Sequence, residues 1–280
     1  MPINSTHLQR AVEKAALLRG VNPKRLRHTV ASTVVLQMVP GGVVKGGTGV
    51  RQRVSEHQAR LTNDLDFARP HDVGMDDFAD AFADSLAEGW GGFTGRLREG
   101  RKASPDGVPG EYVMEPFRVV LQYRGTDYGS VLFELGHSEV GSADDAVERL
   151  GTDVVAIFEE LGLPTPKPVP VMRVEHQIAQ KIHACTSVGP GGTNSRAHDL
   201  VDIQILCGVE DIDYAEIGRI GQRLFAYRQL HAWPPTVGVH PGWESLYQAA
   251  LVDLESEFVV ADVHAAADVV NEIIRRAVGT

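Results

Sequence analysis

The sequence predicts an α/β (α+β) protein in two parts, an α/β domain over residues 1–165 and a helical domain over residues 166–280. Apolar residues recur at helical spacing in the first forty positions, and strand-like apolar segments follow in the middle of the chain. Beyond a proline-rich stretch, Leu163–Val171, the pattern is helix after helix. A chain of 280 residues is long enough to bury two hydrophobic cores.

The first part of the chain gives the clearest element boundaries. Two helices are expected in the first forty residues, and the second begins with Asn22 as its N-cap and Pro23 at its first position. A short apolar segment then leads into the glycines that follow Lys45. A strand is expected over residues 64–67 and a helix over residues 76–90.

A flexible connection, a hairpin and a linker are expected next. Residues 89–111 combine glycines with polar residues and are predicted to connect two elements without regular structure. Residues 112–123 and 130–135 are predicted to form antiparallel strands around a loop. Four prolines in Leu163–Val171 exclude a helix there and favour an extended linker.

Composition restricts the function classes. The formal charge of −10 argues against a protein that binds nucleic acid through an overall positive charge. Any contact with nucleic acid is therefore expected to involve a local group of basic residues. The candidates for local contact are Lys24, Arg25, Arg27, Arg51, Arg53 and Arg60, with a solvated helix face as the alternative. Two cysteines and the absence of a signal-peptide pattern or a long apolar run predict a cytoplasmic protein that does not engage a membrane.

The glycines after Lys45 are candidates for holding phosphates. Gly46 and Gly47 let the backbone approach an anion closely, because no Cβ blocks the amides and positive φ is permitted. Thr48 follows them and completes the candidate nucleotide-binding segment. The segment is neither a Walker loop nor a dinucleotide fingerprint, since the lysine precedes the glycines and G-x-G-x-x-G is absent. A plain strand-to-helix turn is the alternative.

Asp64 and Asp66 are candidate metal ligands. On a strand, residues i and i+2 point to the same face, so the two carboxylates repel unless a cation or a proton separates them. Divalent metal ions remove this repulsion and can activate an attacking oxygen while neutralising a leaving pyrophosphate. Glu134 interrupts an apolar run and is the candidate third carboxylate. A solvated acidic edge is the alternative for the pair, and an edge-strand glutamate for Glu134.

Lys181 is expected to face the interior of a helix in the second domain. It shares a sector with apolar neighbours and is predicted either to snorkel outward or to meet an anion. The residues expected on the opposite, solvated side are Glu175, His176, Ala179, Gln180 and His183.

A later helix is expected to place Asp199 and Asp202 on its inner side, with Arg196 one turn earlier. The aspartates are predicted to orient Lys181 or a metal, and a salt-bridged helix start is the alternative.

Four motifs in order, `KGGTG`, `TNDLDF`, `IAQKIHA` and `RAHDLVD`, give the chain a resemblance to the AbiEii nucleotidyltransferase toxins, and among them to the MenT group, over roughly residues 30 to 260. The resemblance implies a polymerase-β-like nucleotidyltransferase fold with a mixed sheet and a helical C-terminal part. It also implies an antitoxin partner and transfer of a nucleotide, often a pyrimidine such as that of CTP, to the 3′ end of tRNA, which stops aminoacylation.

Position by position, the resemblance assigns Gly46, Gly47 and Thr48 to the nucleoside triphosphate, Asp64 and Asp66 to Mg²⁺ (or Mn²⁺) and to catalysis, Lys181 and Asp199 to catalysis, and Lys181, Arg196 and Asp202 to nucleotide binding. Lys45, next to the glycines, is a further candidate for the triphosphate, and Glu134 remains the candidate third metal ligand from the residue pattern. Two positions depart from the family pattern: Thr48 replaces a commoner serine, and His198-Asp199 replaces a commoner Arg-Asp.

Two other functions are left open by the residues. The His198-Asp199 pair, with His176 and His183 upstream, is also typical of metal-dependent phosphohydrolases. A catalytically weak member that only binds a nucleotide or a partner is the second alternative. The transferase hypothesis expects the aspartate pair and Lys181 to meet across one cleft.

Overall fold

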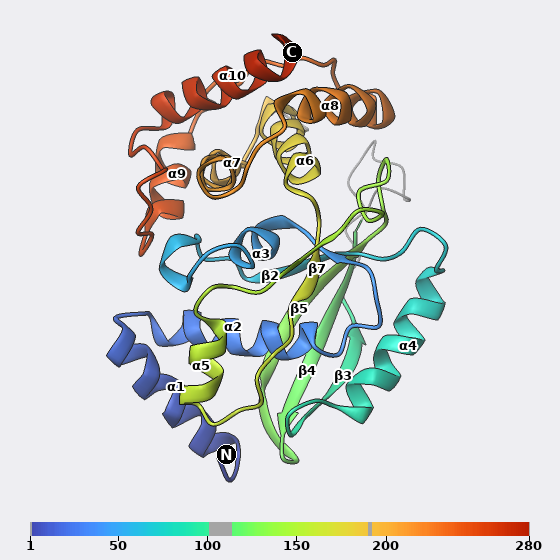
Figure 1. Cartoon of the computed structure of the whole chain (residues 1–280), viewed down its shortest axis with the longest axis vertical. Helices are drawn as coiled ribbons and strands as arrows, with labels where there is room; N and C mark the ends of the chain where they lie inside the picture. Colours follow the sequence, from blue (N-terminus) through green and yellow to red (C-terminus); the bar gives the residue numbers. More distant parts are fainter. Residues whose placement is uncertain (1, 101–113, 190–191, 280) are drawn as a thin grey trace. The chain divides into compact units, whose positions relative to one another are not determined.

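The computed structural model describes residues 2–100, 114–189 and 192–279, and these pack into two compact units (Figure 1). The first unit contains residues up to 56, 61–138 and 146–171. The second contains residues 57–60, 139–145 and 172 onward. Residues 57–60 and 139–145 therefore belong to the second unit, although the residues on either side of them in the chain belong to the first unit.

Two helices open the first unit, as the apolar spacing predicts. The first, α1 (Ser5–Arg19), is capped by the side chain of Asn4. The second, α2 (Pro23–Leu36), begins with the predicted cap, because the Asn22 side chain accepts a hydrogen bond of 2.9 Å from the Lys24 amide. Proline at the first helical position costs no hydrogen bond, since that amide has no partner within the helix.

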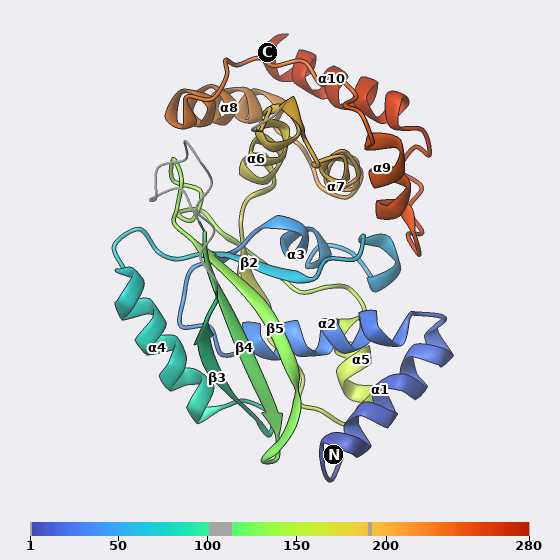
Figure 2. The same ribbon diagram turned by 180° about the vertical axis from the view of Figure 1, so that it is seen from behind.

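A mixed seven-stranded sheet forms the centre of this unit (Figures 1 and 2). Its strand order is β3-β4-β5-β2-β1-β7-β6. The strands are β1 (Val43–Val44), β2 (Asp64–Ala68), β3 (Phe93–Glu99), β4 (Glu115–Tyr123), β5 (Thr126–Gly136), β6 (Val147–Arg149) and β7 (Val169–Val171). β2 pairs in parallel with β5 and antiparallel with β1. The remaining helices of the unit are α3 (Gly46–Arg51), α4 (Met75–Glu88) and α5 (Val154–Glu160).

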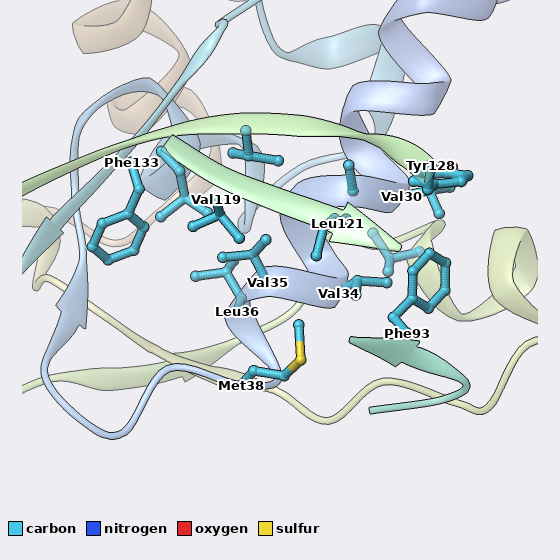
Figure 3. Close-up of a cluster of buried hydrophobic side chains, with 14 of the residues drawn as sticks. Val30, Val34, Val35, Leu36, Met38, Phe93, Val119, Leu121, Tyr128 and Phe133 are labelled. Carbon is cyan, nitrogen blue, oxygen red and sulfur yellow. The ribbon is translucent and has the colours of Figure 1, made fainter. Parts of the chain in front are cut away.

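The hydrophobic core covers one face of β3, β4 and β5. Val119, Leu121 and Phe133 point toward α2 and meet its apolar side chains, among them Val34 and Val35 (Figure 3). Strand residues between these positions point the other way and are partly or fully exposed. The three long strands therefore have one buried face and one face that is free of the core.

Three features differ from the sequence prediction. The stretch 89–111, predicted as a connection, contains β3, in which Phe93 and Gly95 are buried; residues 101–113 lie outside the described residues. The hairpin turn between β4 and β5 is tighter than predicted, because residues 126–129 belong to β5. The proline-rich stretch ends in β7, which pairs with β1 and β6 and is part of the sheet.

The second unit is helical. Its helices are α6 (Val174–Thr186), α7 (His198–Val209), α8 (Tyr214–Arg228), α9 (Trp243–Leu251) and α10 (Val263–Gly279). α6 packs against both α7 and α8, so the side predicted to be solvated is largely covered. His183, predicted on that side, is buried against Phe225 and His231. Glu175, His176 and Ala179 are also buried, and that part of the prediction is wrong.

No helix in the described part of the chain combines the length and the apolar character that crossing a membrane requires.

Candidate functional site

Asp64 and Asp66 occupy alternate positions of β2. Both are partly exposed, whereas Leu65 and Phe67 between and after them are buried in the core. The alternation of the strand therefore displays the two carboxylates on one face, as the sequence predicts.

Glu134 lies directly beside this pair. In the parallel register of β2 and β5, Asp66 is paired with Glu134 and Asp64 with Leu132. Side chains of paired residues on neighbouring strands share a face, so Glu134 joins the aspartates. Asp64, Asp66 and Glu134 are called the carboxylate row below. They bring concentrated negative charge to the face of the sheet that is free of the core.

The Cα of Gly46 lies against the Asp66 carboxylate. A Cβ added at Gly46 would stand 1.7 Å from Asp66 Oδ2 and 2.4 Å from Cγ. The backbone of Gly46 also has φ +59°, which side-chain-bearing residues rarely adopt. In addition, the Lys45 amide donates a hydrogen bond of 3.0 Å to the Asp66 carbonyl. The glycine segment is thus fitted closely around the aspartate strand.

Lys45 and Thr48 complete the contacts of this segment. Lys45 Nζ lies 3.1 Å from Met114 Sδ and beside Gly136, two residues beyond Glu134 on β5. Thr48 is buried, and its hydroxyl donates a 2.9 Å hydrogen bond to the Asp64 carbonyl. The threonine side chain therefore holds the aspartate strand in place, while Lys45 brings a positive charge close to the carboxylate row.

The second unit contains a buried cluster of charges around Lys181. Lys181 Nζ donates to Asp199 Oδ1 at 2.9 Å and to Asp202 Oδ2 at 2.6 Å, and both carboxylates are fully buried. Arg60 binds both oxygens of Asp202 at 2.9 Å. Arg196 donates to Asp199 Oδ2 at 2.7 Å, with 47 % of its side chain exposed. These five residues are called the ion cluster; its inward lysine and aspartates confirm the sequence prediction.

Lys181, Asp199 and Asp202 are held in their charged forms within the ion cluster. Burial alone would lower the pKa of Lys181, but the carboxylates of Asp199 and Asp202 outweigh burial and raise it. Burial would likewise raise the pKa of Asp199, yet Lys181 and Arg196 hold it below its usual range. With three cations and two carboxylates, the cluster has a formal excess of one positive charge.

Arg60 is a member of this cluster that sequence reasoning assigned elsewhere. It is among the basic residues that are candidates for local nucleic-acid contact, with a solvated helix face as the alternative, and the structure pairs it with Asp202, far along the chain. No spacing pattern indicates that pair. The structure also buries Arg25, Arg51 and Arg53. Arg25 is ion-paired with Glu56 at 2.7 Å, so these three are structural residues of the interior.

The histidines of the phosphohydrolase alternative are not arranged around a common point. His183 Nδ1 lies 3.1 Å from Arg228 Nη1, and burial lowers the His183 pKa to about 3. Asp199 is held by Lys181 and Arg196. In the residues that the structure describes, no group of three or more histidine, cysteine or acidic side chains is assembled as a ready-made metal site, and this holds for the carboxylate row as well as for the histidines. The geometry gives this alternative no support.

Comparison with known proteins agrees with the fold and the motifs. The family model for the AbiEii toxin, described as a nucleotidyl transferase of a type IV toxin–antitoxin system, matches residues 40–269. The structure is similar to MenT4, nucleotidyltransferase toxin Rv2826c from Mycobacterium tuberculosis H37Rv, with a TM-score of 0.62 and 18 % identity over 97 % of this chain and 90 % of that chain. No curated protein sequence matches. The chain belongs to the AbiEii nucleotidyltransferase toxins of type IV toxin–antitoxin systems.

Proposed function

We propose that this toxin transfers a nucleoside monophosphate from a nucleoside triphosphate to the 3′ end of tRNA, with Asp64 and Asp66 at the centre of the reaction. The observation that supports this most strongly is the carboxylate row, in which Asp66 stands beside Glu134 and Asp64 shares their face. Transfer of this kind needs concentrated negative charge that can hold a divalent cation against phosphate oxygens.

The residues present fit Mg²⁺. This ion keeps several waters and is commonly bound through one or two carboxylates together with substrate phosphates, so it needs no complete protein cage. Asp64 and Asp66 would hold it, with Glu134 as a third oxygen donor. When bound, such an ion, or Mn²⁺ in its place, would neutralise charge on the triphosphate and favour the ionised form of the attacking hydroxyl.

The chain's own residues would orient both reactants. Gly46, Gly47 and Thr48 would place backbone amides near the triphosphate, and Lys45 would add a positive charge beside the carboxylate row. One carboxylate of the row, Asp64, Asp66 or Glu134, would accept the proton of the 3′-hydroxyl. Catalysis would rest on position and charge, since phosphoryl transfer requires little covalent chemistry from the protein.

The ion cluster is proposed to contribute to nucleotide binding through its excess positive charge. Lys181, Asp199 and Asp202 are too deeply buried and too well paired to change partners easily, so they would act by holding Arg196 and Arg60 in place. Arg196 is the exposed member and the one that would meet an anion. The expectation that Lys181 and the carboxylate row meet across one cleft stays a prediction.

The choice of nucleotide, of acceptor RNA and of protein partner is proposed from the family resemblance. The nucleotide is proposed to be CTP or another pyrimidine triphosphate, the acceptor a tRNA whose extended 3′ end can no longer be aminoacylated, and the protein partner the cognate antitoxin. The proposed site of action is the cytoplasm.

The position of the radiolabel tests the reaction class. Purified protein is incubated with Mg²⁺, total tRNA and CTP or UTP labelled at either the α- or the γ-phosphate. Nucleotidyl transfer predicts RNA labelled only from the α-phosphate. Release of the γ-phosphate without labelled RNA would instead indicate hydrolysis. Toxicity that survives Asp64→Ala would indicate a protein that acts by binding alone.

A further inference from the structure

One face of β3, β4 and β5 carries a polar surface next to the carboxylate row. Residues on the opposite face, such as Val119 and Phe133, are buried against the helices (Figure 3). On the free face, Arg96 and Arg98 of β3 and Arg118 of β4 are all exposed. Their antiparallel register pairs Arg98 with Arg118, which places the two guanidinium groups on neighbouring strands of the same face.

A hollow joins these arginines to the carboxylate row. It has a volume of about 530 Å³ and is lined by Arg98, Glu99, Gly100, Pro116, Arg118, Leu132 and Glu134. Glu134 is the member of the row that stands beside Asp66. The hollow is therefore lined by two cations, Arg98 and Arg118, and two carboxylates, Glu99 and Glu134, and Glu134 connects it to the carboxylate row.

Neither arginine is neutralised within the described residues. Arg118 donates a 3.1 Å hydrogen bond to the hydroxyl of Ser130, which is uncharged, and Arg98 is in no ion pair. Three other arginines of this unit are ion-paired: Arg19 with Glu160, Arg25 with Glu56 and Arg27 with Glu13. In a chain of net charge −10, two neighbouring exposed guanidinium groups that form no ion pair within the described residues favour a binding surface for an anion.

The strand order separates this surface from the glycine segment. From β3 the order runs through β4 and β5 to β2, which carries the aspartates, and then to β1, which leads into Lys45 and Gly46. Neighbouring strands are about 4.8 Å apart, so β4 lies about 10 Å from β2 and β3 about 14 Å. The arginines and the glycines thus lie on opposite sides of the aspartates.

We infer that Arg98 and Arg118 bind the phosphodiester backbone of the acceptor RNA just upstream of its 3′ end. This inference rests on the proposed function. Attacking and leaving oxygens lie roughly in line on opposite sides of the reacting phosphorus, so an acceptor on the arginine side complements a triphosphate on the glycine side. Guanidinium groups bind phosphate oxygens in bidentate fashion and carry no sequence preference. The surface would position the strand, with base identity read elsewhere.

The test separates acceptor binding from chemistry. The double variant Arg98→Gln/Arg118→Gln is compared with Arg98→Lys/Arg118→Lys and with Arg10→Gln, an exposed arginine of α1 outside this face. The glutamine pair is expected to raise KM for tRNA about tenfold or more through loss of two charge-assisted contacts. KM for the nucleotide and kcat at saturating tRNA should stay near the wild-type values. The lysine pair should recover part of the affinity, and Arg10→Gln should match the wild type.

Salt dependence gives an independent result. A plot of log Kd for RNA against log salt concentration is expected to lose a slope of about 1.4 in the glutamine pair, since each single-strand phosphate contact contributes about 0.7. Thermal unfolding of each variant excludes misfolding as the cause. An unchanged KM for tRNA, or a rise confined to KM for the nucleotide, would overturn the inference while wild-type transfer stands. Failure of the wild type to label any RNA would instead overturn the proposed function.

Discussion

The carboxylate of Asp66 fills the space that a side chain at Gly46 would need. Oδ2 lies 1.7 Å from the position of a Cβ on Gly46, and the Asp66 Cβ itself would be 2.8 Å away. The contact ties the glycine segment to the aspartate strand in one unit. Glycine is therefore required by the shape of the site, in addition to the freedom that its positive φ demands.

Gly46→Ala should abolish most of the transfer activity. The methyl group would force Asp66 to turn away, and a displacement of about 1 Å in a catalytic group costs about 100-fold in rate. The matched control is Gly20→Ala, where φ is +67° and nothing lies within 4 Å of the added Cβ. Both variants carry comparable backbone strain, so only the first should lose label transfer. Equal activities in the two would show that Asp66 is not held by this contact.

Lys181→Met should lower the free energy of unfolding by about 3–5 kcal/mol, because it leaves two buried carboxylates without their shared cation. Asp199 keeps its contact with Arg196 and Asp202 keeps Arg60, but both carboxylates are fully buried and water cannot replace the lost ammonium group. Urea unfolding measures the change. Lys14→Met, on the exposed surface of α1, removes the same charge and should change the stability little.

Adding Asp202→Leu to Lys181→Met gives a further check on the ion cluster. If the lost stability comes from the broken contact between Lys181 and Asp202, the double variant should lose less stability than the sum of the two single variants. Strict additivity would contradict the assignment of Lys181 and Asp202 as a coupled pair.

The stability of the chain should fall as the pH drops below about 6.5, in part because of His183. Burial, aided by Arg228 and His231, lowers the pKa of His183 from 6.5 to about 3. Between these two values the imidazole is protonated in the unfolded chain and neutral in the folded chain. The contribution of this histidine is complete above about pH 6.5 and declines by up to about 1.4 kcal/mol per pH unit toward pH 3.

The slope of unfolding free energy against pH between 7 and 5 measures this effect. His183→Gln should make the slope shallower, whereas His71→Gln, at an exposed position, should leave it as in the wild type. A slope that is the same in all three proteins would mean that His183 is not held neutral in the folded state.

Local patterns predicted the helices, the aspartate strand and the inward face of α7 well. The cap at Asn22, the alternation of Asp64 to Phe67 and the spacing of Asp199 and Asp202 are all set by neighbours in sequence. Periodicity also identified Lys181 as an inward residue, although it could not reveal that α6 is covered on both sides.

The parts that were missed depend on long-range pairing. β3 has only a weak apolar alternation, so its residues predict a connection, and Arg98 cannot be recognised as a strand residue from the sequence. The partnership of Arg60 with Asp202 and the exact fit of Asp66 to Gly46 are also invisible to spacing, because each joins segments through the fold. Register alone brings Glu134 beside Asp66, and that register is fixed by two strands far apart in the sequence.

The transfer rate of Asp66→Asn tests the central claim most directly. The rate of incorporation of α-labelled nucleotide into tRNA is measured at saturating Mg²⁺ and nucleotide for the wild type, Asp64→Asn, Asp66→Asn and Asp80→Asn, the last an exposed control on α4. Loss of a charged group from the reaction centre predicts a fall of about 100-fold or more for the two strand variants and none for the control. Wild-type rates in both strand variants would contradict the placement of the reaction at the carboxylate row.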